Sequence, residues 1–145
     1  MRRHLTALGF AVGNLRRHAG TTAAQLRVDA DLRWLIERGL QLCAQNALDI
    51  ATHLAQSGGR DAADYTTAID RLAEMGVLPG EFAARFRSVA GFRNVLVHGY
   101  LDVDLDLVGQ VLSRHLTDFE VFSHHVEGWL DQAGSDPAPN PPTPP

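Results

Sequence analysis

Apolar residues recur at spacings of three and four along most of this chain, which is the period of an amphipathic α-helix. A first helix is predicted over residues 4–18, where one face carries the apolar side chains of Leu5, Leu8, Val12 and Leu15. A much longer apolar stripe covers residues 23–56. At its start, Thr22 and Gln25 have the spacing of a capping box. We expect this second helix either to bend or to span the whole domain.

The same periodicity continues through the rest of the chain. Asp64 is a candidate cap for a shorter helix, Pro79 suits the first turn of the next one, and Asp102 or Asp104 caps the last. These signals predict three further helices, over residues 65–75, 79–98 and 105–131. The alternation Val103–Val108 is short and leads into helical periodicity, so it is assigned to a helix start. The sequence therefore predicts an all-α fold, an up-and-down bundle of about five helices.

The length of 145 residues suggests one domain. Six of the seven prolines lie in the last nine residues, which changes the interpretation of that end of the chain. We expect a helical domain over residues 1–133. The remaining residues, 134–145, are predicted to form a disordered proline-rich tail that is partly polyproline II, with no assigned role.

Composition restricts the classes of function. A net charge of −4 and a pI near 5.9 argue against a broad, nonspecific nucleic-acid binder, although they leave room for a locally basic cleft. All 13 basic residues are arginine, which binds phosphate in a bidentate manner. The single cysteine, Cys43, lies in an apolar stripe and is expected to be an inert core residue of a protein from a reducing compartment. No apolar stretch is long enough to cross a bilayer, so the protein is expected to be cytoplasmic, with no membrane association.

Residues 92–100, FRNVLVHGY, contain the candidate catalytic residues. On an ideal helix Arg93 and His98 point about 140° apart, whereas Asn94 and His98 share a face. Gly99 allows the chain to leave helical geometry directly after the histidine. The three polar side chains can converge only near a distorted helix end or between two packed elements. A dimer interface would supply the second of these packed elements.

Arginine, asparagine and histidine together suit phosphodiester chemistry. His98 can move a proton near neutral pH, and Arg93 can hold a phosphate and stabilise its developing charge. Asn94 can orient either the histidine or the phosphate. No metal is required if the 2′-hydroxyl of RNA is the nucleophile. Taken by itself, however, an arginine and a histidine on one helix are more often a surface pair or a packed core histidine.

The segment RNVLVHGY resembles the Arg-x4-His-x-Tyr motif of HepT-type proteins, which are members of the HEPN group of helical domains. The similarity extends to residues 31–53, which resemble the long second helix of that family. It also includes residues 65–78, which resemble its short third helix and the following turn. Together these segments cover most of residues 5–130, and only the proline-rich tail falls outside.

This resemblance implies a homodimeric five-helix bundle that cuts RNA without a metal or cofactor, as the toxin of a type VII-like toxin–antitoxin system. It implies that Arg93 and His98 are the catalytic pair, with Asn94 as their polar companion, in a cleft shared by two subunits. It also implies that Tyr100 receives AMP from an MntA-like nucleotidyltransferase antitoxin, which inactivates the toxin through added charge and bulk. RNA is then the substrate, and DNA is not expected to be one.

Two other functions remain open at the level of sequence. The chain could be a noncatalytic HEPN module that binds nucleotides or assembles with a minimal nucleotidyltransferase, in which case the motif serves an interface. It could also be a structural bundle in which the motif is coincidental, although the complete motif and the similarity along the chain argue against this. Growth arrest on expression alone, relieved by Arg93→Ala or His98→Ala, would separate the nuclease from the binding module.

Asp49 is the remaining candidate for a supporting role. It lies among apolar residues of the long helix, where a buried carboxylate needs a partner, and Arg93 is one candidate for that partner. An exposed aspartate on the helix face is the equal alternative. By contrast, Arg85 and Arg87 are assigned to a solvated face, with RNA contact as the alternative. His53, one helical turn beyond Asp49, is a weaker candidate, and the three histidines of the last helix are assigned to packing or surface positions: His115, His124 and His125.

Overall fold

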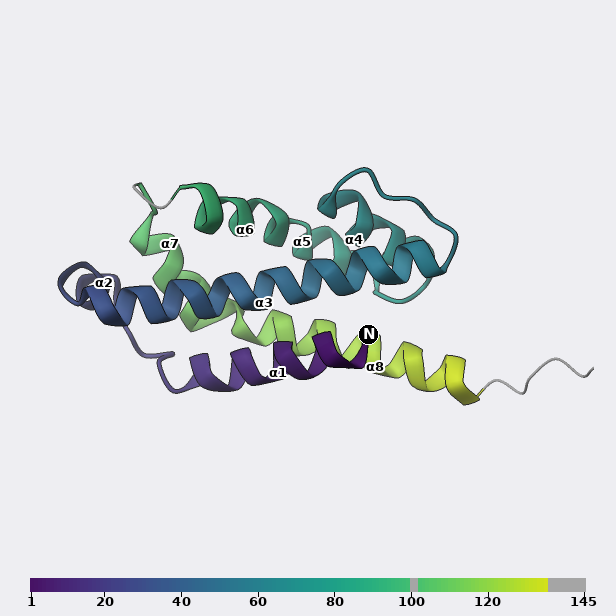
Figure 1. The fold of residues 1–145 in the computed structure, drawn as a ribbon, viewed down its shortest axis with the longest axis horizontal. Coiled ribbons are helices and arrows are strands. Elements are labelled where there is room, and N and C mark those ends of the chain that lie inside the picture. The colour runs from purple at the N-terminus through teal and green to yellow at the C-terminus, as the bar shows by residue number, and fades with distance from the viewer. Residues whose placement is uncertain (100–101, 136–145) are drawn as a thin grey trace, which may run out of the picture.

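The computed structural model describes residues 1–99 and 102–135, and these residues form helices without strands (Figure 1). The elements in chain order are α1 (Arg2–Arg16), α2 (Ala23–Val28), α3 (Ala30–Ser57), α4 (Tyr65–Glu74), α5 (Gly80–Phe86), α6 (Ser88–His98), α7 (Leu105–Gln110), the π-helical turn η1 (Val111–His115) and α8 (Leu116–Ser135). The predicted all-α class is therefore confirmed. The predicted tail falls almost entirely on residues 136–145, which lie outside the described residues.

Helix α3 is the central element of the bundle. It runs the length of the molecule, with α4, α5 and α6 on one side and α1 and α8 on the other (Figure 1). It packs directly against α1, α4, α6 and α8. Its buried stripe consists of small and branched apolar residues that are fully enclosed: Ile36, Leu40, Cys43, Ala44, Ala47, Leu48, Ile50 and Ala51. Because three of these are alanines, neighbouring helices can approach α3 closely.

The long helix predicted over residues 23–56 is bent by an interruption at Asp29. The backbone of Asp29 is extended, with φ −118° and ψ 95°, and its carboxylate accepts a hydrogen bond from the Leu32 amide at 3.0 Å. Asp29 therefore caps α3 and ends α2. A continuous helix is the wrong prediction, because the short polar side chain of aspartate competes with the helical hydrogen bond. The capping box of Thr22 and Gln25 is present as predicted.

The helix predicted over residues 79–98 is divided into α5 and α6 at Arg87. Arg87 keeps helical angles, φ −53° and ψ −32°, so the division is a bend and not an exit from helical geometry. Pro79 occupies the N-cap of α5 in an extended conformation, one position before the predicted first turn.

The last predicted helix begins at its expected cap and contains an unexpected π-helical turn. The Asp104 carboxylate accepts hydrogen bonds from the amides of Asp106 and Leu107 at 3.0 and 3.2 Å. Between α7 and α8, residues Val111–His115 widen into η1, a type of irregularity that often occurs at functional sites. In the part of the chain that the structure describes, no helix combines the length and apolarity needed to cross a membrane.

The contact between α1 and α3 depends on Gly39. A Cβ atom at Gly39 would lie 2.7 Å from Cδ2 of Leu15, a side chain that is 1% exposed and has no room to move. We expect Gly39→Val to lower the free energy of unfolding by about 1–3 kcal/mol, because overpacking forces the two helices apart. Gly13→Val is the matched control, since a Cβ there meets nothing within 4 Å. Urea unfolding of both variants checks this, and equal stabilities would contradict the close contact.

Candidate functional site

Packing of α6 against α3 determines where Arg93 points. Ala90 and Leu96 are the buried residues of α6, and Arg93 lies between them in sequence. Its half-buried side chain consequently lies against α3. The Arg93 Nε donates a hydrogen bond to Gln45 Oε1 at 2.8 Å, and Nη1 donates to Asn94 Oδ1 at 3.2 Å. The guanidinium is thereby held in one orientation by two neutral acceptors.

Gln45 connects the arginine to two further polar groups. Its Nε2 donates to Asp49 Oδ1 at 2.8 Å and to the Tyr65 hydroxyl at 3.1 Å. The Arg93 Cζ also lies 5.7 Å from the centre of the Tyr65 ring, within the range of a cation–π contact. Asp49 is half-buried and reaches Arg93 only through Gln45. Asp49 and Arg93 therefore do not form the direct pair that the sequence suggests. Both are instead hydrogen-bonded to the side-chain amide of Gln45.

His98 lies outside this network. It is the last residue of α6 and is exposed, and among the described residues it forms no hydrogen bond. Gly99 follows with φ −96° and ψ 23°, so it is not left-handed. A Cβ at Gly99 would instead lie 2.8 Å from the Val95 carbonyl oxygen, and this close approach is what favours glycine. Tyr100, the predicted modification site, lies outside the described residues.

The structure therefore joins some of the predicted site residues and separates others. Arg93, Asn94 and Asp49 belong to one hydrogen-bonded group through Gln45. His98 is exposed at the end of α6 and is not part of this group. On an ideal helix the two motif residues Arg93 and His98 point about 140° apart.

Among the described residues, no carboxylate pairs directly with Arg93. Arg85 and Arg87 are each ion-paired, with Asp118 at 3.5 Å and with Asp70 at 2.8 Å. In the same part of the chain, the polar partners of Arg93 are the amides of Gln45 and Asn94, its Cζ lies near the ring of Tyr65, and its Nη2 has no hydrogen bond. This difference separates Arg93 from the two arginines that precede it.

The described residues include one buried thiol and no cluster of metal-ligand side chains. Burial raises the pKa of the Cys43 thiol to about 12, so at neutral pH it stays protonated and poorly nucleophilic. Within residues 1–99 and 102–135, no three His, Cys, Asp or Glu side chains lie close enough together to hold a metal ion.

The Thr67 backbone amide and side chain lower the pKa of Asp64, which caps α4 next to Tyr65.

Sequence reasoning missed Gln45 and Tyr65. Gln45 precedes Asp49 by four residues, so helical spacing alone places the two on one face. No spacing predicts that Gln45 meets Arg93, because these residues are 48 apart in the chain. Tyr65 was recognised only as the start of a helix. The remaining histidines lie elsewhere, with His115 bonded to Asp118 and the His125 ring 5.7 Å from that of Phe82.

Comparison with known proteins gives a family match over most of the chain. The sequence model of the family described as "Ribonuclease HepT-like" matches residues 10–126. An mRNA nuclease HepT from Shewanella oneidensis is 28% identical over 100 residues, which are 68% of this chain and 75% of that protein. A tRNA nuclease HepT from Aphanizomenon flos-aquae is 25% identical over 128 residues, which are 87% of this chain and 86% of that protein.

Solved structures share the same fold at lower sequence identity. A tri-AMPylated HEPN toxin from Shewanella oneidensis, solved in complex with its MNT antitoxin, superimposes with a TM-score of 0.77 and 22% identity, covering 87% of this chain and 95% of that one. The cytosolic protein YutE from Bacillus subtilis, of unknown function, gives a TM-score of 0.75 and 17% identity, covering 95% and 94% of the two chains. These likenesses concern the fold.

The Gln45 relay makes a prediction about Arg93. Gln45→Leu removes the acceptor for Arg93 Nε and leaves Asp49 and Tyr65 without their shared donor. We expect a loss of about 1–3 kcal/mol in the free energy of unfolding. We also expect faster solvent exchange of the Arg93 Nε proton, measured by NMR. Gln56→Leu, an exposed position on the same helix, is the control. Unchanged exchange of the Arg93 Nε proton in Gln45→Leu would show that Gln45 does not hold the guanidinium.

Proposed function

This chain belongs to the HepT-like ribonuclease family, and from that premise we propose that it is a metal-independent endoribonuclease acting as the toxin of a toxin–antitoxin pair. The observation that carries the proposal is the state of Arg93, a half-buried guanidinium held by Gln45 and Asn94, to which no carboxylate of residues 1–99 and 102–135 is bound. Such a group is oriented and charged, and it is ready to bind a phosphate. The relatives named as mRNA and tRNA nucleases support RNA as the substrate class.

Each motif residue has a definite role in this reaction. The 2′-hydroxyl of the RNA attacks the adjacent phosphorus atom, and the bond to the 5′-oxygen of the next nucleotide breaks. Arg93 binds the non-bridging oxygens and stabilises the negative charge that they gain in the transition state. His98 transfers a proton to or from the reacting oxygens. Because the RNA supplies its own nucleophile, the step needs neither a metal ion nor a cofactor.

The active form is a homodimer. On an ideal helix Arg93 and His98 point about 140° apart, which favours a site that a second chain completes. A second copy packed across this region supplies the missing wall, and a two-fold axis makes the cleft symmetric. The phosphate then meets arginine and histidine side chains from both subunits. This arrangement also gathers positive charge locally on a chain whose net charge is −4.

Regulation follows from Tyr100, two residues beyond His98. A nucleotidyltransferase antitoxin resembling MntA would join the Tyr100 phenolic oxygen to the α-phosphate of ATP, forming tyrosyl-AMP and releasing pyrophosphate. The new phosphate places negative charge where RNA phosphates must bind, and therefore blocks the cleft. The complex of an AMPylated HEPN toxin with its MNT antitoxin supports this assignment. The site of action is the cytoplasm, where both RNA and ATP are available.

Cleavage of RNA in excess EDTA tests the nuclease. We expect the wild type to cut total RNA or tRNA, and His98→Ala to lose about 10²–10⁴-fold in rate, the usual contribution of acid–base catalysis. Arg93→Ala should lose about 10²–10³-fold. His53→Ala and Arg87→Ala are matched controls, because both residues are exposed and lie outside the Arg93 network. No cleavage by folded, unmodified wild type would favour the noncatalytic HEPN module instead.

The modification site has its own test. We expect the purified cognate nucleotidyltransferase to transfer label from α-³²P-ATP to the wild type and not to Tyr100→Phe. The labelled wild type should lose its RNA cleavage, whereas Tyr100→Phe should stay active in the same mixture. Tyr65→Phe serves as the control, since Tyr65 is the other tyrosine of the chain. Labelling of Tyr100→Phe at the wild-type level would refute the assignment.

A further inference from the structure

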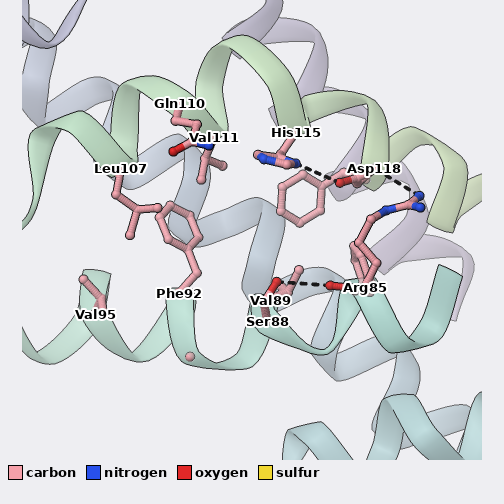
Figure 2. A pocket seen from close by; sticks show the side chains of 13 residues that line it. Arg85, Ser88, Val89, Phe92, Val95, Leu107, Gln110, Val111, His115 and Asp118 are labelled. Carbon is pink, nitrogen blue, oxygen red and sulfur yellow. Dashed lines mark hydrogen bonds and ion pairs between the residues drawn. The ribbon is translucent and has the colours of Figure 1, made fainter. Parts of the chain in front are cut away.

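A cavity of about 540 Å³ separates α6 from the helix formed by α7, η1 and α8 (Figure 2). Phe92 of α6 points across it toward Leu107 of α7 and Val111 of η1 (Figure 2). Its volume lies within the usual range of small-molecule sites, about 300–1,000 Å³, and its walls are mainly apolar. The π-helical turn contributes Val111 and His115 to its wall, so the irregular part of the last helix borders this space.

One end of the cavity is polar and contains an ordered histidine. His115 Nδ1 lies 3.1 Å from Asp118 Oδ2, and Arg85 Nη2 lies 3.5 Å from Asp118 Oδ1 (Figure 2). Asp118 is the only acid among the described residues that line the cavity, and both of its oxygens have a partner. With Nδ1 bonded to the carboxylate, His115 keeps Nε2 for a ligand. The exposed Gln110 adds an amide with both a donor and an acceptor.

The mouth of the cavity lies beside the face of α6 that carries His98. Gly91 and Val95 both line the cavity, and on an ideal helix they point about 20° and 60° away from His98. Arg93 points about 140° away from His98 and does not line this space. An RNA strand whose phosphate reaches His98 therefore passes over the edge of the cavity. Val95 and Leu107 are the partly open apolar residues at this edge, each little more than one-third exposed.

We propose that this cavity is a nucleobase subsite that binds one unpaired base of single-stranded RNA next to the scissile phosphate. The base stacks on Phe92, and the Gln110 amide and His115 Nε2 bond to its polar edge. Arg85, whose side chain is 58% exposed, stays paired with Asp118 at the polar end of the cavity. Splayed bases of single-stranded RNA are recognised in this manner, by stacking on aromatic rings and by hydrogen bonds to base edges. The inference rests on the proposed function, for which it supplies a source of sequence preference.

Filling the cavity from its mouth tests the subsite. Leu107→Trp places an indole in the space without removing a buried core side chain, and Val28→Trp is the matched control because Val28 is 86% exposed on α2. The probe is a single-stranded 2′-O-methyl RNA, which cannot be cut because its nucleophile is blocked. We expect Leu107→Trp to bind it at least about fivefold more weakly in fluorescence anisotropy, the effect of losing one stacked base. Val28→Trp should bind it like the wild type.

A second measurement reads the base preference itself. Sequencing of the RNA ends left by the wild type should reveal a preferred base at one position beside the cut. Leu107→Trp should flatten that preference. Gln110→Glu, which replaces an amide donor with an acceptor at an exposed position, should change which base is preferred. If both variants give the wild-type profile and the wild-type affinity, the cavity does not bind a base.

Three further outcomes are decisive. If Leu107→Trp converts a dimer into monomers in analytical ultracentrifugation, the cavity is an interface and the subsite is refuted. If free AMP binds in a Leu107-dependent manner while the 2′-O-methyl RNA does not, the site takes free nucleotides and its assignment to RNA is refuted. If the wild type binds the uncut RNA in a Leu107-dependent manner but cleaves no natural RNA, the nuclease function fails while the base-binding cavity is supported.

Discussion

The rotation of α6 about its own axis is the constraint on which the site depends. Ala90 and Leu96 must be buried, and burying them turns Arg93 toward α3 and leaves His98 exposed at the helix end. A helix that advances about 100° per residue cannot bring both polar side chains to one side while keeping the same residues in the core. The chemistry of the motif is thereby divided between two faces, and a second copy of the chain is the simplest way to reunite them.

The arginine is held by an amide, and this choice has electrostatic consequences. A carboxylate placed against Arg93 would orient it but would also neutralise the charge that the proposed phosphate contact requires. Gln45 supplies an acceptor for Arg93 and a donor for Asp49, so the carboxylate acts on the amide and not on the guanidinium. Tyr65 completes the arrangement through its hydroxyl and its ring. The guanidinium is therefore held in place by neutral acceptors, and its positive charge is not paired with a carboxylate of the described residues.

Two irregularities in the helices shape the surroundings of the motif. The helix is divided at Arg87 between α5 and α6, and the π-helical turn Val111–His115 interrupts the last helix. The two helices enclose the cavity beneath Phe92 between them. The π-helical turn also contributes to the core, because Leu112 within it is fully buried. Helix α6 and the last helix leave an apolar space with polar groups at one end beside the face that carries His98.

The sequence by itself determined the helical class and the cap at Asp64, and it narrowed the last cap to Asp102 or Asp104, because these follow from local periodicity and from hydrogen bonds within a few residues. The motif also indicated the family, and with it the substrate class. Only the tertiary structure decided that Gln45 holds Arg93 and that His115 faces a cavity beside α6. Such contacts join residues far apart in the chain and depend on how each helix is rotated and bent by its neighbours, which apolar periodicity does not specify. The break at Asp29 was missed for a related reason, since a capping aspartate can interrupt a stripe without changing which of its residues are buried.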